Sequence, residues 1–179
     1  MDGDTVRLAR PEDAPAIAHI YNQAIEDRIA TFETEPRTAA EIEALLGERG
    51  DAYPTVVVER GGRVVGWAWV GPYRTRPCYA GVGEFSVYVE RETRGRGAGR
   101  AAVQGLMEAC RRRGFWKLLS RIFPENVASR ALCRRVGFRE VGIYERHAKL
   151  DGAWRDCVIV EKLIDVVPDD EPAPDPGAR

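Results

Sequence analysis

The sequence predicts a single α/β domain in which a mixed sheet is flanked by helices. The chain has 179 residues, within the usual range for one domain. Strand-like and helix-like patterns follow one another in the order β-α-α-β-β-β-α-β-α-β-β. A glycine-rich stretch, RGRGAGR at 94–100, lies between a strand-like segment and a long amphipathic segment. These patterns indicate a layered fold with a ligand-binding turn at the start of a helix.

The first half of the chain has the signals of strands, two helices and a hairpin. Expected here are a strand at 5–9, a helix at 10–27, a short helix that begins after Thr38 and ends near Gly47 or Gly50, and strands at 55–59, 64–71 and 81–89. Pro11 suits the first turn of a helix, and Thr38 with Glu41 forms a capping box. Gly61 and Gly62 supply the positive φ angles that a tight hairpin needs.

The second half continues the pattern and ends in a polar tail. Expected here are a helix from the glycine-rich stretch to Gly114, a strand at 116–123, a helix at 125–138 closed by Gly137, and strands at 139–146 and 154–164 joined by a loop with Asp151 and Gly152. We expect one domain over residues 1–165. The segment 166–179 is rich in proline and aspartate, a composition that predicts disorder.

Charge and composition exclude several classes of partner. Lys and Arg number 27 and Asp and Glu 28, a formal net charge of −1, so nothing favours nucleic acid or an anionic membrane. The sequence has no run of the ~20 apolar residues that a membrane-spanning helix needs. Four cysteines occur without a Cys-x-x-Cys pair and two histidines lie far apart, so we expect neither a metal site nor a disulfide framework. A small-molecule partner and a cytoplasmic location fit best.

The glycine-rich stretch is typical of an anion-binding helix start. Backbone N–H groups in a first helical turn lack intrahelical partners and carry the positive end of the helix dipole, so bare backbone there favours a phosphate. The stretch is not a P-loop, because no Lys-Ser or Lys-Thr follows it. It is not a dinucleotide fingerprint either, because Arg100 stands where the third glycine belongs. The alternative is a plain turn solvated by its arginines.

The spelling Arg94-x-x-Gly97-x-Gly99, after FSVYV and before PENVASRALCRRVGF, resembles the GCN5-related N-acetyltransferase (GNAT) superfamily. The resemblance covers about residues 5–164. It implies a mostly antiparallel central sheet with splayed strands, and acetyl-CoA as co-substrate without a metal. The implied cofactor-binding residues are Val87, Tyr88 and Val89 for pantetheine, Arg94, Gly95, Arg96, Gly97, Ala98, Gly99 and Arg100 for the pyrophosphate, and Asn126 and Cys133. For Asn126 the alternative is a helix cap.

Longer segments carry a narrower resemblance. IYNQAIEDRIATFETEP, VGPYRTRPCY, GEFSVYV and LDGAWRD resemble the phosphinothricin N-acetyltransferases and the arsinothricin-type enzymes, most of all the arsinothricin-type branch. This resemblance implies direct acetyl transfer from acetyl-CoA to the α-amine of a small amino acid with an acidic or sulfone-like side chain, such as phosphinothricin, arsinothricin or methionine sulfone. It also implies a homodimer. The alternatives are an acetyltransferase for protein N-termini or polyamines, and a CoA-binding module without catalysis.

Glu84 is the expected catalytic base. It matches the family glutamate in E-x-x-V-Y-V, and an amino-acid ammonium must lose a proton before it attacks a thioester. The alternative is a strand residue paired with an arginine. The backbone N–H of Tyr88 or a neighbour is expected to meet the oxyanion. Cys133 stands where related enzymes have tyrosine or histidine, and it either packs inside its helix or carries the acetyl group in a covalent route.

Cationic and aromatic residues form the expected acceptor site. They are Phe32, which would wall the pocket, and Tyr73, Arg74, Arg76 and Tyr79 from the PYRTRPCY segment. Arginine suits carboxylate and phosphinate groups because its planar donors bind two oxygens together. The alternative for this segment is a solvated turn. His147 and Lys149 lie either on the surface or against a neighbouring subunit.

Overall fold

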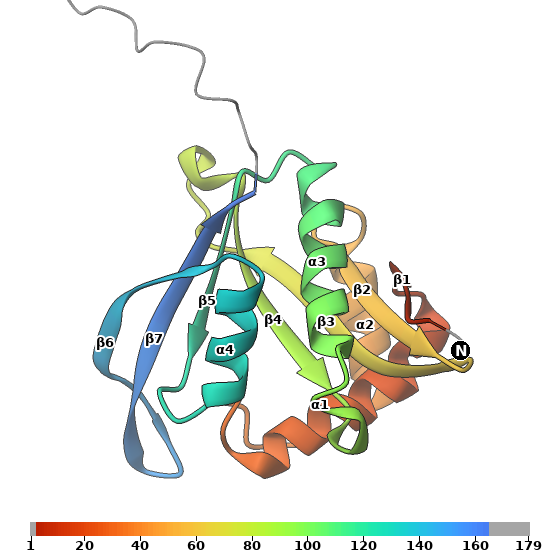
Figure 1. Ribbon diagram of the computed structural model, residues 1–179, viewed down its shortest axis with the longest axis horizontal. Helices are drawn as coiled ribbons and strands as arrows, with labels where there is room; N and C mark the ends of the chain where they lie inside the picture. Colours follow the sequence, from red (N-terminus) through yellow and green to blue (C-terminus); the bar gives the residue numbers. More distant parts are fainter. Residues whose placement is uncertain (1–2, 165–179) are drawn as a thin grey trace, which may run out of the picture.

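Seven strands form one mixed sheet in the order β1-β2-β3-β4-β5-β7-β6 (Figure 1). The computed structural model describes residues 3–164, and the tail expected to be disordered at 166–179 lies outside the described residues. The main elements are β1 (Thr5–Leu8), α1 (Ala14–Asp27), α2 (Ala39–Arg49), β2 (Thr55–Arg60), β3 (Arg63–Pro72), β4 (Val82–Val89), α3 (Ala98–Arg111), β5 (Lys117–Ile122), α4 (Val127–Arg135), β6 (Arg139–Leu150) and β7 (Ala153–Leu163). The predicted order of helices and strands is confirmed.

Helices cover both faces of the sheet. In Figure 1, α3 and α4 lie in front of the sheet and α1 and α2 lie behind it. The core on the α3 side includes Leu106, Leu118 and Phe85, and the core on the α1 side includes Ile17 and Trp67; all five side chains are buried. The apolar residues that recur every three or four positions in α1 and α3 therefore face the sheet.

The predicted cap and hairpin signals are present. The Thr38 hydroxyl accepts a hydrogen bond from the Glu41 N–H at 3.2 Å, and the Glu41 carboxylate accepts one from the Thr38 N–H at 2.7 Å. This capping box starts α2. Gly61 and Gly62 have φ angles of 56° and 73°, which suit the tight turn between β2 and β3.

Strand β6 is longer than expected and ends at Leu150 instead of 146. The pairing register with β7 shifts after Tyr144, where Arg146 has a φ angle of 47° and its N–H donates to Asp156 Oδ1 at 2.7 Å. This bulge interrupts the alternation of side chains, and for that reason the polar segment after it resembled a loop. The true turn consists of only two residues, both with positive φ.

Strands β4 and β5 run parallel and pair only at their first residues. The register joins Val82, Gly83 and Glu84 to residues 117–119, and beyond Glu84 the two strands diverge, as Figure 1 shows. All other pairs of strands are antiparallel. The predicted mostly antiparallel sheet with splayed strands is confirmed. The divergence leaves the β5-facing edge of residues 85–89 without a strand partner.

Replacing Gly83 by alanine should destabilise the point at which β4 and β5 meet. A Cβ atom there would lie 2.4 Å from Val70 Cγ2 and 3.0 Å from both Leu118 Cδ2 and Phe115 Cε1. Overpacking of this kind costs ~1 to 3 kcal/mol, so the urea midpoint should fall at an unchanged m value. The matched control is Gly142→Ala, whose Cβ would meet nothing within 4 Å. Equal midpoints for the two variants would contradict the tight packing at Gly83.

Candidate active site

A glycine-rich turn connects the end of β4 to the start of α3. Gly95 and Gly97 have φ angles of 77° and 95°, a left-handed conformation that residues with a side chain disfavour. A Cβ atom at either position would meet nothing within 4 Å, so conformation and not space requires glycine. Within residues 3–164, the backbone N–H groups from Arg94 to Arg100 have no hydrogen-bond acceptor. The turn therefore has the open amides that an anion site needs.

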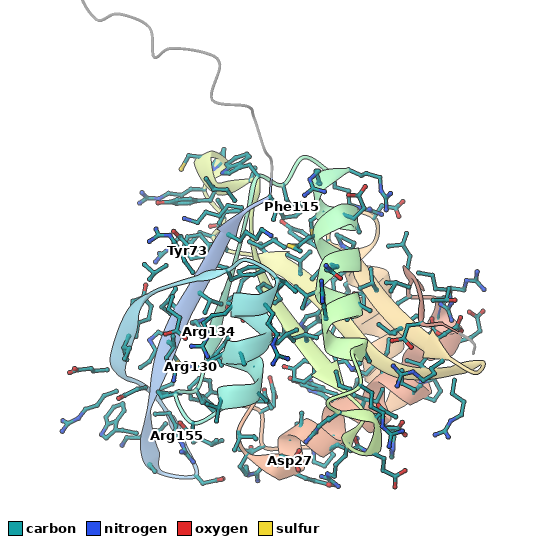
Figure 2. All side chains as sticks on the ribbon, in the orientation of Figure 1. Asp27, Tyr73, Phe115, Arg130, Arg134 and Arg155 are labelled. Atoms are coloured by element: carbon teal, nitrogen blue, oxygen red, sulfur yellow. The ribbon has the colours of Figure 1, made fainter. Side chains whose placement is uncertain are left out.

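The arginines of this turn differ in their partners. Arg94 pairs with Asp27 at the end of α1, with 2.7 Å between Nη1 and Oδ2; Figure 2 labels Asp27. Burial raises the pKa of Asp27, but hydrogen bonds from Arg94 and Arg91 outweigh burial and hold that pKa below its ordinary value. Arg96 and Arg100 are exposed and form no ion pair within the described part of the chain. Their charges are available to a phosphate, whereas Arg94 fixes the turn to α1.

Alternation along β4 directs the backbone of Val87 toward the opening between the strands. The Phe85 carbonyl accepts a hydrogen bond from the Ser120 hydroxyl of β5 at 2.8 Å. Backbone groups of alternate residues point to the same side of a strand, so the N–H and C=O groups of Val87 and Val89 also face β5. Those of Tyr88 face β3. The backbone N–H of Tyr88 or of a neighbour was expected to meet the oxyanion. The N–H groups of Val87 and Val89 point into the opening between β4 and β5, and that of Tyr88 does not.

Glu84 is the last residue of β4 that pairs with β5, and its side chain lies on the face of the sheet that carries α1. Its Oε1 atom lies 2.6 Å from both Nε and Nη2 of Arg121. Its Oε2 atom has no hydrogen-bond partner among residues 3–164. The side chain is 27% exposed. The pairing with an arginine that the sequence allowed is therefore present, and it leaves one carboxylate oxygen free.

Arg121 is the residue beside Glu84 that the sequence reasoning missed. It lies on β5, and its Nη1 atom is 3.1 Å from His147 Nε2 on β6. Because a guanidinium only donates, the His147 ring accepts through Nε2. His147 was expected on the surface or at a neighbouring subunit, and within one chain it contacts Arg121. The available signal for Arg121 was a charged residue in the middle of a predicted central strand.

The acceptor residues expected in the β3-β4 connection surround a hollow. Arg74, Thr75, Arg76 and Tyr79 line a cavity of about 400 Å³. The Arg74 guanidinium lies 5.2 Å from the centre of the Tyr73 ring, and the rings of Tyr73 and Tyr79 meet edge to face at 5.5 Å. Both arginines are exposed. The hollow is cationic, as the binding of an acceptor with an acidic side chain would require. Its exposure is also compatible with the solvated-turn alternative.

Phe32 lies in the connection between α1 and α2 and packs on the end of β5. Its ring meets the Phe123 ring edge to face, with 4.8 Å between the centroids. The two rings form a small apolar cluster with Leu150 and Cys157. Phe123 is two residues beyond Arg121 along the strand, so both side chains leave the same face of the sheet. Phe32 therefore bounds the face that carries Glu84.

Asn126 serves as the cap of α4. Its Oδ1 atom accepts a hydrogen bond from the Ser129 N–H at 3.1 Å, and its Nδ2 atom donates to the Ile29 carbonyl at 3.1 Å. The second bond ties the start of α4 to the connection between α1 and α2. The cap alternative is therefore present, and contact with pantetheine stays a prediction.

Cys133 packs in the core between α4 and the sheet and is 1% exposed. Burial raises the pKa of its thiol to about 12. Nucleophilic sulfur is thiolate, so a thiol of this kind is inert near neutral pH. The environment favours the packing role over a covalent acetyl-cysteine, and it does not place the sulfur at the opening between the strands.

Other chemistry-bearing groups are sparse in the described residues. Within 3–164, three His, Cys, Asp or Glu side chains nowhere gather as metal ligands. No helix in the same range is both long enough and apolar enough to cross a bilayer. The four cysteines are free thiols, and Cys78 is the exposed one.

Comparisons with known proteins agree with this geometry. A family model described as the Acetyltransferase (GNAT) family matches residues 17–138, a range that contains Glu84, the glycine-rich turn and α4. The chain belongs to the GNAT acetyltransferase family. It is an acetyl-CoA-dependent N-acetyltransferase, as the named relatives and the acetyl-CoA complexes of neighbouring structures support.

Three relatives show how far the similarity extends. An L-methionine sulfoximine/L-methionine sulfone acetyltransferase of Pseudomonas aeruginosa is 32% identical over 163 residues, which are 90% of this chain and 95% of that protein. A GNAT superfamily phosphinothricin acetyltransferase from Sinorhizobium meliloti, solved in complex with AcCoA, is 30% identical with a TM-score of 0.82, over 89% of this chain and 88% of that one. A ribosomal-protein-alanine N-acetyltransferase from Brucella melitensis is 35% identical with a TM-score of 0.85, over 89% and 99%.

Thiol labelling should distinguish Cys78 from the buried cysteines. Burial raises the pKa of Cys110 and of Cys133 to about 12, so at pH 8 only ~1 part in 10⁴ of each is thiolate. Ellman's reagent should therefore give one fast phase in the native protein and four reactive thiols in denaturant. Cys78→Ser should remove the fast phase and Cys133→Ala should retain it. A fast phase that disappears in Cys133→Ala would contradict the burial of that sulfur.

Proposed function

We propose that this chain acetylates the α-amine of a small amino acid with an acidic or sulfone-like side chain, of the phosphinothricin, arsinothricin or methionine sulfone type. The observation that carries the proposal is the position of Glu84, whose free Oε2 atom lies on the same strand as the open backbone of Val87. A base and a cofactor-binding edge thus share one rigid element. Relatives named for methionine sulfone and phosphinothricin support this class of acceptor.

The acetyl group moves directly in a ternary complex. Glu84 Oε2 takes a proton from the acceptor ammonium, and the neutral nitrogen attacks the thioester carbonyl carbon. The N–H of Val87 or Val89 meets the resulting oxyanion. The carbon–sulfur bond then breaks, and CoA leaves as a thiolate that takes up the second proton of the nitrogen and becomes the free thiol. A thiol with a pKa of ~8.5 leaves without a dedicated acid, which agrees with an inert Cys133.

We assign the pyrophosphate of acetyl-CoA to the turn at 94–100. Its open amides lie at the positive end of the α3 dipole, and Arg96 and Arg100 add charge without competing internal partners in the described chain. Pantetheine adds to the free edge of β4 at Val87, as a short extra strand. Asn126 lies at the start of α4, which follows β5, the other strand of the divergence.

We assign the acceptor side chain to the hollow of Arg74, Arg76 and Tyr79. Two guanidinium groups and a phenol suit phosphinate, arsenic-containing acid or sulfone oxygens. Phe32 contacts the aliphatic part of the acceptor from the side of the connection between α1 and α2. This assignment leaves the α-amine for Glu84.

Acetylation of a protein N-terminus is the second candidate. The Brucella melitensis relative, named a ribosomal-protein-alanine N-acetyltransferase, favours it. Polyamines fit poorly, because they need an acidic pocket and the hollow at Arg74 and Arg76 is cationic. A non-catalytic CoA-binding module does not account for the free carboxylate oxygen of Glu84 beside the open edge of β4.

We also propose a homodimer and a cytoplasmic location. The hairpin of β6 and β7 exposes large apolar side chains, with Ile143 at 58%, Tyr144 at 50% and Trp154 at 55%. An apolar surface of this kind favours burial against another chain, and a second copy is the usual partner of a small enzyme. The free thiols of the described cysteines fit a reducing compartment.

Glu84→Gln should lower turnover by ~10² to 10⁴ and leave acetyl-CoA affinity unchanged, because an amide does not accept the proton. Thiol release from acetyl-CoA measures turnover with a panel of phosphinothricin, arsinothricin, methionine sulfone and ordinary amino acids. Calorimetric titration measures acetyl-CoA affinity. Glu43→Gln, at an exposed position of α2, is the matched control and should behave as wild type. Unchanged turnover of Glu84→Gln from pH 6 to 9 would remove its role as base.

Gly97→Ala should weaken acetyl-CoA binding about 10-fold. The φ angle of 95° is strained for alanine by ~1 to 2 kcal/mol, and relief of that strain moves the open amides of the turn. The KM for acetyl-CoA should rise, with little change in the KM for the acceptor. Gly47→Ala is the control, since Gly47 lies in α2 with ordinary φ and open space around its Cα. An unchanged KM for acetyl-CoA in Gly97→Ala would speak against a pyrophosphate site at this turn.

A further inference from the structure

The ion pair between Glu84 and Arg121 involves only one of the two carboxylate oxygens of Glu84. One oxygen of Glu84, Oε1, accepts a hydrogen bond from Arg121 Nε at 2.6 Å and lies 2.6 Å from Nη2 of the same guanidinium. The other oxygen, Oε2, has no partner among the described residues. An ion pair that served only to stabilise the sheet would gain from using both oxygens, as bidentate arginine–carboxylate pairs do. Arg130 and Glu140 form such a bidentate pair elsewhere in this chain, at 2.9 and 3.0 Å.

The guanidinium of Arg121 also has unused donors. A guanidinium has five N–H groups. In Arg121, Nε donates to Glu84 Oε1, Nη2 lies in ion-pair contact with the same oxygen, and Nη1 donates to His147 Nε2. At least one N–H group on each of Nη1 and Nη2 therefore remains without a hydrogen-bond partner within residues 3–164. The side chain is 43% exposed, so a small molecule reaches these groups. Two parallel terminal N–H groups are the donor set that binds both oxygens of a carboxylate.

These free groups match the head group of an α-amino acid. In an α-amino acid, a cationic ammonium group and an anionic carboxylate are attached to the same carbon. The site has a free anionic oxygen on Glu84 and a free pair of cationic donors on the Arg121 that touches it. We propose that Glu84 and Arg121 together recognise the α-amino-acid head group, with the amine on Glu84 Oε2 and the α-carboxylate on the terminal N–H groups of Arg121. This inference rests on the proposed function and names the acceptor class more narrowly.

The arrangement divides the recognition of an acceptor between two places. Arg121 holds the α-carboxylate, and Arg74 and Arg76 remain for the side chain. The nitrogen that reacts is then fixed at the base, because a carboxylate held in two bonds leaves one orientation for the amine. His147 supports this role as a positioning residue, since its ring accepts from Nη1 and limits the rotation of the guanidinium. Amines without a free α-carboxylate, such as polyamines and protein N-termini, lack the group that Arg121 binds.

The test compares one acceptor with its ester. L-Methionine sulfone and its methyl ester share the amine and the neutral side chain and differ in the charge of the α-carboxylate. Arg121→Gln should lower kcat/KM for the free acid by about 10- to 100-fold, mainly through KM, because a charge-assisted bidentate contact is lost. The same variant should change kcat/KM for the ester by less than about threefold. Any general effect of the substitution on Glu84 changes kcat/KM for the acid and for the ester alike, so it cancels in the ratio of the two values.

Arg130→Gln is the matched control. Arg130 lies on α4, where Figure 2 labels it, and its replacement removes a bidentate pair with Glu140 of β6. It leaves the sheet face of Glu84 untouched. The ratio of kcat/KM for the free acid to kcat/KM for the methyl ester should be the same in this variant as in the wild type. Equal losses for acid and ester in Arg121→Gln would overturn the proposal and reduce Arg121 to a partner that orients Glu84. A wild-type enzyme that acetylates no amino acid of the panel would instead contradict the proposed function.

A second variant covers the case in which Arg121→Gln does not fold. Arg121→Lys keeps a point charge without the paired donors. We expect it to retain acetyl-CoA affinity and to show a loss for the free acid that is smaller than that of Arg121→Gln, again with little effect on the ester. The ratio of kcat/KM for the free acid to kcat/KM for the ester could instead be the same in Arg121→Lys as in the wild type, at full acetyl-CoA affinity. That result would also count against recognition through paired donors.

Discussion

The divergence of β4 from β5 is the constraint on which the rest of the site depends. The two strands pair over three positions that end at Glu84, and the missing side chain of Gly83 lets Val70, Leu118 and Phe115 close around this junction. Beyond it, the edge of β4 is free at Val87. The carboxylate is therefore held by the paired part of a strand, and the open amide lies on the unpaired part. Three residues of strand, about 10 Å, separate them. In the proposed function, this separation sets the distance between the thioester and the base.

Charge distribution around this junction follows from which arginines already have partners. Surface ion pairs contribute only ~0 to 1 kcal/mol each, so their main effect here is orientation. Arg94 is committed to Asp27 and fixes the turn before α3, whereas Arg96 and Arg100 remain uncommitted at the amides of that turn. Arg121 stands between these cases, because it orients Glu84 and still has donors to offer. A chain of nearly zero net charge thus has locally cationic groups at the glycine-rich turn and beside Glu84.

Local patterns predicted nearly all of the fold, since capping boxes, glycine turns and apolar periodicity act over a few residues. The conformation of the glycine-rich turn and the position of Glu84 on its strand were predictable for the same reason, because each lies in a short segment with a recognisable sequence motif. Arg121 and His147 were not. They meet because β7 inserts between β5 and β6 in the sheet, and the order of strands is a non-local property that no segment encodes. The bulge near Arg146 added a second obstacle, since it interrupted the alternation that marks a strand.

The acceptor class that we propose follows from which polar groups of the site each candidate acceptor would leave unpaired. A protein N-terminus places a neutral peptide carbonyl where an amino acid has its carboxylate, so the two free N–H groups of Arg121 would keep only water as partner. A site built around a charged hydrogen bond rejects a ligand that lacks the charged group, and the rejection is strongest where water is excluded. Arg121 is 43% exposed, which weakens this discrimination in the single chain. A second copy packed on the exposed apolar side chains of β6 would shield His147 and its partner, and the same contact that forms a dimer would then sharpen the preference for free amino acids.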